Sequence, residues 1–323
     1  MLTRDDGVCL IYPGLTHSIH GESESGKSMV CQIEAARLLA GGEQVVYVDF
    51  ESDPAAIVER LRLFGATDAQ ILAGFRYLQP EVSFNTTGED RLAWEGLLRQ
   101  RPALVIIDGV TEAINLFGYS SNDNDELTKW GRMFPRRLAD ATGAAVVMVD
   151  HVTKSTDGRG RFAIGGQAKL AMITGAAYSV EVEQPLGRGL RGEIKLMVGK
   201  DRPGYVRGHA GPMQGSSRTQ EAARVIIDSI DADARPEVRI SAPEHVEEEN
   251  GFRPTGYMAK VSKYLETSDG AAISQSALVD GVGGTNRDMT RRAIDMLVAE
   301  GYVSRTAGPR NAKMYTSLRT FRE

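Results

Sequence analysis

The sequence predicts an α/β fold, with a mainly parallel sheet in the larger N-terminal part of the chain and a small helix-rich domain at the C-terminal end. Three short runs rich in Val and Ile alternate with amphipathic stretches; they are residues 45–50, 103–109 and 144–150. Runs that are apolar on both faces are typical of parallel strands covered by helices. From Pro254 onward the spacing of apolar residues becomes helical, which indicates a second domain.

The stretches between these runs supply the expected helices. Residues 28–40 (SMVCQIEAARLLA) are amphipathic, and residues 53–65 begin with Asp53 as N-cap and Pro54 at the first helical position. Further strands are expected within 192–200 and 223–241, the second range containing a turn at the DADARP stretch. Strands that alternate with helices predict right-handed crossovers.

The two parts are expected to be joined by a linker. We expect a domain at residues 1–241, an acidic and polar linker at 242–253, and a small domain at 254–323. The small domain has three helical segments followed by a segment that predicts two strands around a Gly-Pro turn; they are residues 257–267, 274–282, 286–301 and 302–318. Three helices and a hairpin indicate a winged helix-turn-helix.

Composition limits the class of protein. The 323 residues are 41% hydrophobic and 25% charged, with a net charge of −5, as expected of a soluble globular protein. The chain has no apolar run of about eighteen residues, and its first residues are too polar for a secretory signal peptide. Cys9 and Cys31 lack metal-ligand spacing and are expected to be small buried thiols. We therefore expect a cytoplasmic protein with no membrane partner.

A glycine-rich segment, GESESGKS, follows an apolar run and opens the helix at 28–40. It fits the P-loop pattern G-x-x-x-x-G-K-[ST], in which glycines let successive N–H groups point inward at a helix N-terminus that favours anions. Lys27 would meet the β- and γ-phosphates and Ser28 would ligate Mg²⁺, so ATP and Mg²⁺ are the expected cofactors. The predicted nucleotide site comprises Gly21, Glu22, Ser23, Glu24, Ser25, Gly26, Lys27 and Ser28, with Glu22 and Glu24 pointing to solvent. A glycine turn with a surface lysine is the alternative.

Carboxylates end two of the predicted strands. Asp108 closes ALVIIDG, where a Walker-B acid would hold the water bound to Mg²⁺; a cap after a core strand is the alternative. Asp49 and Glu51 close the strand at 45–50, and alternation puts both on one face. Glu51 lies just past the strand end and has the freer reach, so we expect it to be the general base for hydrolysis. A capping role in front of Asp53 is the alternative for Glu51.

The order of these motifs resembles that of the RecA/DnaB superfamily: a P-loop, a strand ending in D-x-E, a Walker-B strand, and a strand ending in a polar sensor. Over about residues 1–210 the chain is most similar to RepA-type plasmid and phage helicases and their actinobacterial relatives, usually labelled AAA-family ATPases. The resemblance implies a RecA-like P-loop NTPase core in which Glu51 activates water. It also implies that His151, with Thr153 and Lys154, senses the γ-phosphate; a hydrogen-bonded histidine at a strand end is the alternative.

Two further segments gain an interpretation from this resemblance. Residues 158–170 (GRGRFAIGGQAKL) alternate Arg and Gly, which suits a loop that contacts single-stranded DNA in a ring channel; a subunit contact or a plain surface loop are the alternatives. GKDRPG at 199–204 resembles the K-x-R element whose Lys and Arg reach into the neighbouring subunit's ATP site. This maps onto Lys200 and Arg202 and implies a homo-oligomer, expected to be a hexamer. Ordinary charges at a hairpin tip are the alternative.

The C-terminal domain is the expected duplex-DNA reader. Residues 254–323 carry ten Lys/Arg and seven Asp/Glu, a modest positive surplus on an otherwise acidic chain. The third helix would begin near Thr285 or Asn286 and bury Met289, Ala293, Met296 and Leu297. The residues expected to face DNA are Arg287, Arg291 and Arg292 on that helix and Arg305, Arg310 and Lys313 on the wing. A winged helix used for protein contact is the alternative.

The sequence therefore predicts an ATP-hydrolysing, DNA-associated motor, a ring-forming helicase or translocase of the plasmid or phage replication type. A regulatory or recombination-mediator ATPase that uses ATP as an assembly switch, without unwinding, is the second hypothesis. A metabolic kinase on a P-loop is disfavoured, because D-x-E after the second strand suits water activation.

Overall fold

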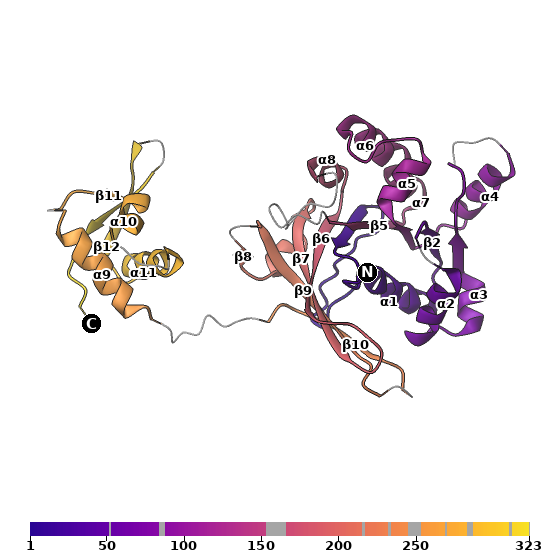
Figure 1. Ribbon diagram of the computed structural model, residues 1–323, viewed down its shortest axis with the longest axis horizontal. Coiled ribbons are helices and arrows are strands. Elements are labelled where there is room, and N and C mark those ends of the chain that lie inside the picture. Colours follow the sequence, from indigo (N-terminus) through magenta and orange to yellow (C-terminus); the bar gives the residue numbers. More distant parts are fainter. Residues whose placement is uncertain are drawn as a thin grey trace. The chain divides into compact units, whose positions relative to one another are not determined.

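The computed structural model divides the chain into two compact units, Met1–His245 and Val246–Glu323 (Figure 1). The structure describes residues 1–51, 53–83, 88–152, 166–214, 217–231, 234–244, 253–268, 270–282, 287–309 and 312–322.

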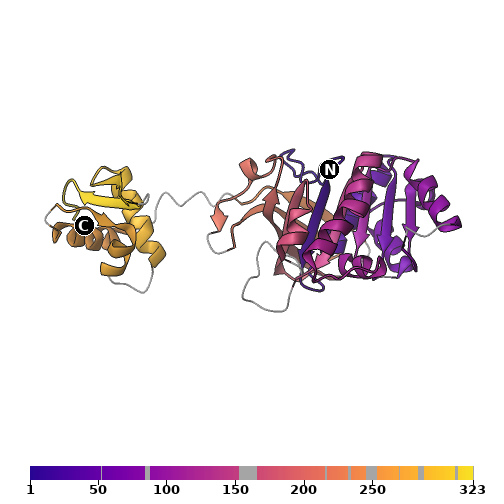
Figure 2. The ribbon, with the colours of Figure 1, turned by 90° about the horizontal axis from the view of Figure 1, so that it is seen from above.

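The larger unit is built on one sheet with the strand order β10-β9-β7-β6-β1-β5-β4-β2-β3, and β8 pairs with β9. Its central strands are mutually parallel: β1 (Thr16–Gly21), β2 (Val45–Asp49), β3 (Phe75–Leu78), β4 (Leu104–Asp108), β5 (Ala145–His151) and β6 (Ala176–Gln184). The sheet continues in antiparallel strands: β7 (Arg191–Asp201), β8 (Met213–Gln214), β9 (Thr219–Asp228) and β10 (Glu237–Ser241). Figure 2 shows the parallel strands side by side. The predicted α/β class with a mainly parallel sheet is confirmed.

Helices cover both faces of the parallel strands (Figure 1). One face packs against α1 (Lys27–Ala40), α2 (Pro54–Leu63) and α3 (Asp68–Gly74). The other packs against α4 (Glu89–Leu98), α5 (Val110–Leu116), α6 (Asn124–Gly131), α7 (Arg137–Thr142) and α8 (Gly166–Ala171), with a π-helical turn at Arg132–Arg136 between α6 and α7.

Strand β4 shows why its sequence is apolar throughout. Ile106 packs in the core with α1 and α2, whereas Ile107 packs in the core with α5 and α6, and neither is exposed. Successive side chains of a strand point to opposite faces, so a strand covered on both sides needs apolar residues at every position. Asp108 is the first polar side chain of this strand, and it lies at the carboxyl end of β4.

Local signals set several boundaries where they were expected. The Asp53 side chain accepts a hydrogen bond from the Ala55 N–H at 3.1 Å and caps α2, which begins at Pro54. The expected turn at DADARP lies between β9 and β10, although residues 232 and 233 fall outside the described residues. One expectation is wrong: Cys31 is buried but Cys9 is exposed, because Cys9 lies in the N-terminal segment and not in a core strand.

The smaller unit contains α9 (Thr255–Glu266), α10 (Gln275–Gly281), α11 (Arg287–Ala299) and the antiparallel strands β11 (Ile273–Ser274), β12 (Val303–Ala307) and β13 (Lys313–Ser317). Its core includes Leu265 of α9, Leu278 of α10, Leu297 of α11 and Tyr315 of β13. The element order is the one expected for a winged helix-turn-helix, and that assignment stays a prediction.

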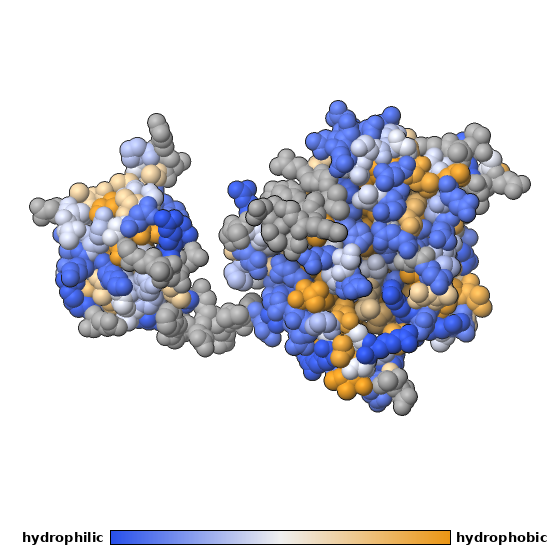
Figure 3. All heavy atoms as spheres, in the orientation of Figure 1, coloured by the Kyte–Doolittle hydropathy of each residue, from blue (hydrophilic) through white to orange (hydrophobic). Residues whose placement is uncertain are grey.

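The surface of the larger unit is mostly hydrophilic on the face shown in Figure 3, with separate apolar patches. Its exposed large apolar side chains include Leu63, Leu190 and Ile230. None of the helices in the described part of the chain is long and apolar enough to cross a membrane.

Candidate functional site

The site lies at the carboxyl edge of four neighbouring parallel strands. Strand pairing sets Gly21 beside His151 and Asp49 beside Asp108, while Glu51 follows two residues after Asp49. Because parallel strands end at the same edge, residues far apart in the sequence meet there. The predicted P-loop, base, metal ligand and sensor therefore converge at one place.

The P-loop spans the turn from β1 to α1. Gly26 precedes the helix with φ of 88°, a left-handed conformation that favours glycine, and no side chain caps the helix. A Cβ on Gly21 would lie 2.9 Å from the Ser25 hydroxyl oxygen and 3.2 Å from the Val180 Cβ, so a larger residue would crowd this position. Glu22 and Glu24 are exposed, as expected. The uncapped N-terminus of α1 presents N–H groups that suit an anion.

Lys27 is held inside this loop. Its side chain is buried, and its ammonium donates to the carbonyl oxygen of Glu22. Burial lowers the pKa of Lys27, while the nearby carboxylates of Asp108 and Glu51 act in the opposite direction. The charge is therefore fixed at the mouth of the loop before any phosphate binds.

Asp108 is buried at the end of β4 and accepts a hydrogen bond of 2.6 Å from the Tyr47 hydroxyl. Gln32 of α1 in turn donates to the Tyr47 oxygen at 3.2 Å. Burial raises the pKa of Asp108, and hydrogen bonds from Tyr47 and Ser28 lower it. Asp108 is thus oriented beside Ser28, the other predicted Mg²⁺ ligand.

The two predicted oxygen ligands, Asp108 and Ser28, fit Mg²⁺. The described residues contain no group of three or more His, Cys, Asp or Glu side chains that could form a metal cage. Mg²⁺ usually takes one or two protein oxygens and completes its shell with waters and substrate phosphates. One carboxylate and one hydroxyl beside a phosphate loop match that preference.

Glu51 faces His151, with 3.2 Å between Glu51 Oε2 and His151 Nε2. Burial raises the pKa of Glu51; contact with Glu112 raises it further, and His151 lowers it. Asp49 has a different role: it is fully buried, accepts from the Tyr77 hydroxyl at 2.9 Å, and accepts from the Glu51 N–H at 3.0 Å. Asp49 therefore anchors the backbone that presents Glu51.

Several side chains at the site were not predicted from the sequence. Tyr47 and Gln32 lie in an expected strand and an expected helix, where they look like ordinary core residues. Tyr77 lies in β3, a strand that was not predicted from the sequence. Glu112 lies on the helix after Asp108, and nothing in the sequence except that position pointed to a role at the site. The same holds for a buried pair behind His151, in which Lys169 of α8 contacts Asp150 of β5 at 2.7 Å.

The predicted finger residues lie at the end of β7. Lys200 donates to the carbonyl oxygens of Leu170 and Ala171, at 2.6 and 3.2 Å, so within this chain it holds the C-terminal end of α8. Arg202 is exposed in the turn that follows β7. Thr153 and Lys154 lie outside the described residues, as does most of the Arg-Gly segment 158–170.

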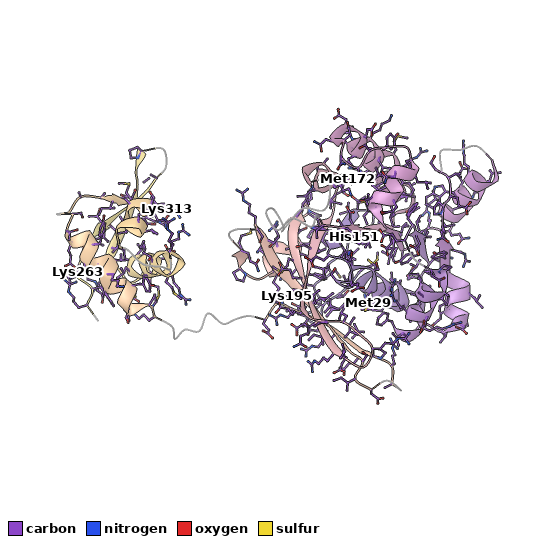
Figure 4. All side chains as sticks on the ribbon, viewed as in Figure 1. Met29, His151, Met172, Lys195, Lys263 and Lys313 are labelled. Carbon is purple, nitrogen blue, oxygen red and sulfur yellow. The ribbon has the colours of Figure 1, made fainter. Side chains whose placement is uncertain are left out.

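The basic residues of the smaller unit lie mostly at its surface. Arg287 is exposed and pairs with Asp280 at 2.8 Å. Arg291 is exposed, and Arg292 is half-buried. Arg305 and Lys313 are exposed on the paired strands β12 and β13; Figure 4 labels Lys313. Arg310, Thr285 and Asn286 lie outside the described residues.

Comparison with known proteins gives the following similarities. A protein family described as "AAA domain" matches residues 10–157. The DNA repair protein RAD51 homolog A of Zea mays is 28% identical over 201 residues, which cover 58% of this chain and 57% of the relative. The DNA repair and recombination protein RadB of Methanoculleus marisnigri is 35% identical over 96 residues, which cover 29% of this chain and 42% of the relative.

Among solved structures, a KaiC-like protein from Pyrococcus horikoshii matches with a TM-score of 0.45 and 10% sequence identity, over 71% of this chain and 89% of that chain. This chain spans about half the length of the curated relatives it matches. The matched segment, residues 10–157, contains the P-loop, Glu51, Asp108 and His151.

Proposed function

We propose that this protein is a DNA-associated ATPase that binds ATP with Mg²⁺ at residues 21–28 and hydrolyses it. The observation that carries the proposal is the convergence of Lys27, Asp108 and Glu51 at one edge of the sheet, next to an uncapped helix N-terminus. A cation, a metal-ligating carboxylate and a second carboxylate with a raised pKa are the parts that phosphoryl transfer to water requires.

The residues divide the work between binding and chemistry. The backbone N–H groups of the P-loop and the Lys27 ammonium bind the phosphates. Ser28 and Asp108 hold Mg²⁺, which when bound neutralises charge on the phosphate oxygens. Tyr47 orients Asp108 by its hydrogen bond of 2.6 Å.

Glu51 is the proposed general base. Its carboxyl group has a raised pKa, which makes it a stronger acceptor for the proton of an attacking water. His151 contacts Glu51 at 3.2 Å and so orients it while sensing the terminal phosphate. Arg202, exposed after β7, is proposed to complete the site of a neighbouring copy, joined by Lys200 once its ammonium leaves the carbonyl oxygens of α8. The active enzyme is then a homo-oligomer, a hexamer if it forms a ring.

Two roles on DNA follow from this ATPase. In the first, the protein is a ring-forming helicase or translocase that moves along single-stranded DNA, with the smaller unit as a winged helix on duplex DNA. In the second, it is a regulatory or recombination-type ATPase that assembles on DNA without unwinding it. The names of the sequence relatives, which are DNA repair and recombination proteins, favour the second role.

The test is the ATPase rate measured without DNA, with single-stranded DNA and with duplex DNA, alongside unwinding of a forked duplex. Lys27→Ala is the control that removes the phosphate contact. Severalfold stimulation by single-stranded DNA with strand separation supports the motor. Slow turnover with duplex binding and no strand separation supports the assembly switch. Hydrolysis that persists in Lys27→Ala would refute the proposed site.

Sharing of sites between subunits needs its own experiment. Lys27→Ala and Arg202→Ala subunits are mixed and the ATPase rate is compared with that of each variant alone. Partial recovery supports a finger supplied by the neighbour, because a mixed interface joins an intact P-loop to an intact Arg202. No recovery at any mixing ratio counts against it.

A further inference from the structure

A buried ion pair lies directly behind the proposed hydrolytic centre. Lys169 Nζ is 2.7 Å from Asp150 Oδ2 and 3.2 Å from the Thr111 hydroxyl oxygen. The Lys169 and Asp150 side chains are 4% and 3% exposed. Burying two charges carries a large desolvation cost, and losing one partner leaves an uncompensated charge. The pair is therefore a built feature of the fold, and the Asp150 carboxylate also acts electrostatically on Lys27 of the phosphate loop.

Both partners of Lys169 stand next to residues that contact Glu51. Asp150 immediately precedes His151 and accepts its backbone N–H at 2.9 Å. Thr111 immediately precedes Glu112, whose carboxyl group contacts that of Glu51. Successive strand residues point to opposite faces, so Asp150 contacts Lys169 on one side while His151 contacts Glu51 on the other. One ammonium thus holds the ends of β5 and α5 together.

The helix that carries Lys169 is itself held in place. The last carbonyl oxygens of α8 accept hydrogen bonds from Lys200 of β7, and a cation at a helix C-terminus is electrostatically favourable. Ala168, next to Lys169, is buried in the core shared with α5 and α6. The ammonium is therefore presented from a fixed backbone.

We propose that Lys169 is a positioning residue for hydrolysis: by holding Asp150 and Thr111, it fixes His151 and Glu112 where they orient Glu51 toward the attacking water. The inference deepens the proposed ATPase function and rests on it. Lys169 touches neither nucleotide nor water in this mechanism, so its loss slows the chemical step and leaves nucleotide binding nearly unchanged.

The experiment compares the full-length wild type with Lys169→Met, Lys169→Arg and Lys195→Met. Lys195 of β7 is the matched control, because it pairs with Glu183 of β6 at 2.8 Å and lies away from His151 (Figure 4). The readouts are kcat, the KM for ATP, the affinity for a fluorescent ADP analogue, and the melting temperature. Lys169→Met is expected to lower kcat roughly 10- to 100-fold while KM and ADP affinity change less than about threefold. Lys169→Arg restores part of kcat, and Lys195→Met behaves as wild type.

Two further variants separate positioning from stability. Asp150→Asn with Lys169→Met removes both charges and is expected to recover the melting temperature of Lys169→Met but not its kcat. In a His151→Ala background, Lys169→Met is expected to cost little additional kcat, because both residues act on Glu51 and neighbouring effects are non-additive.

Four results decide the outcome. If Lys169→Met keeps kcat within about twofold of wild type, or if the double neutral variant restores kcat together with melting temperature, Lys169 only stabilises the fold. A wild type whose ATP turnover does not depend on Lys27 refutes the proposed function itself. An active wild type with Lys169→Met indistinguishable from Lys195→Met refutes this inference alone.

Discussion

Tyr47→Phe removes one hydroxyl and tests whether Asp108 is a Mg²⁺ ligand. The Tyr47 hydroxyl donates to Asp108 Oδ2 at 2.6 Å, and both side chains are buried. This bond lowers the pKa of Asp108 against the effect of burial. Without it, the carboxylate is less well oriented and takes up a proton more readily, so Mg²⁺ binds more weakly.

The size of the effect follows from that bond. A hydrogen bond to a charged group contributes about 1.5–3 kcal/mol, which corresponds to roughly 10- to 150-fold in an equilibrium constant. Loss of a residue that orients a metal ligand typically costs about 10- to 100-fold in metal affinity or activity. We therefore expect the Mg²⁺ concentration for half-maximal ATPase rate to rise by at least about tenfold.

The assay is the ATPase rate as a function of Mg²⁺ at fixed ATP, repeated across pH. Because Asp108 must be ionised to ligate the metal, the acid limb of kcat/KM should move to higher pH in Tyr47→Phe. Tyr178→Phe is the matched control: it removes an equally buried hydroxyl that donates to the Leu10 carbonyl oxygen. Equal Mg²⁺ dependence in wild type and Tyr47→Phe would refute the assignment of Asp108.

Two other perturbations have defined outcomes. Gly26→Ala places a Cβ on a residue with φ of 88° and against the Leu186 side chain. The resulting strain of about 1–2 kcal/mol should weaken ATP binding roughly 5- to 30-fold. An unchanged ATP affinity in a binding titration would contradict the loop geometry. Burial lowers the pKa of His17 from 6.5 to about 4. As the pH falls, the unfolded chain therefore binds this proton before the folded chain does. The free energy of unfolding should fall by up to about 3 kcal/mol as the pH drops from about 6.5 to about 4. His17→Gln should flatten that part of a urea-denaturation series, whereas His209→Gln, at an exposed position, should not; a slope unchanged in His17→Gln would exclude His17 as its source.

The parts of the site that could be predicted are those with local signals. The P-loop is a contiguous motif, and Asp108 and Glu51 follow runs whose continuous apolar character marks them as buried parallel strands. The predicted strand at 144–150 is β5 (Ala145–His151), one residue from the expected range at each end, because residues buried on both faces leave a clear pattern.

The remaining contacts depend on pairing between distant segments. The Tyr47–Asp108 bond joins residues 61 apart, and the Glu51–His151 contact joins residues 100 apart. Alternation along a strand gives the face of a side chain but not the strand that lies beside it. The role of Lys169 was missed for a related reason. It lies near the end of an Arg-Gly segment, where a lysine is expected to be exposed, yet packing against β5 buries it. Arg287 was predicted to face DNA, whereas in the structure it forms an ion pair with Asp280 of α10. That contact depends on how α10 and α11 pack, which the sequence of one helix does not reveal.

In the proposed mechanism, Glu51 performs the chemistry at a site where Lys27 and Asp108 bind the nucleotide and its metal. The most direct measurement is single-turnover hydrolysis of bound ATP by Glu51→Gln, together with its equilibrium affinity for Mg²⁺-ATP. A positioned general base contributes about 10²- to 10⁴-fold, so hydrolysis should slow by at least about 100-fold while affinity stays close to that of wild type. A variant that hydrolyses ATP at the wild-type rate, or that fails to bind it, would contradict the account.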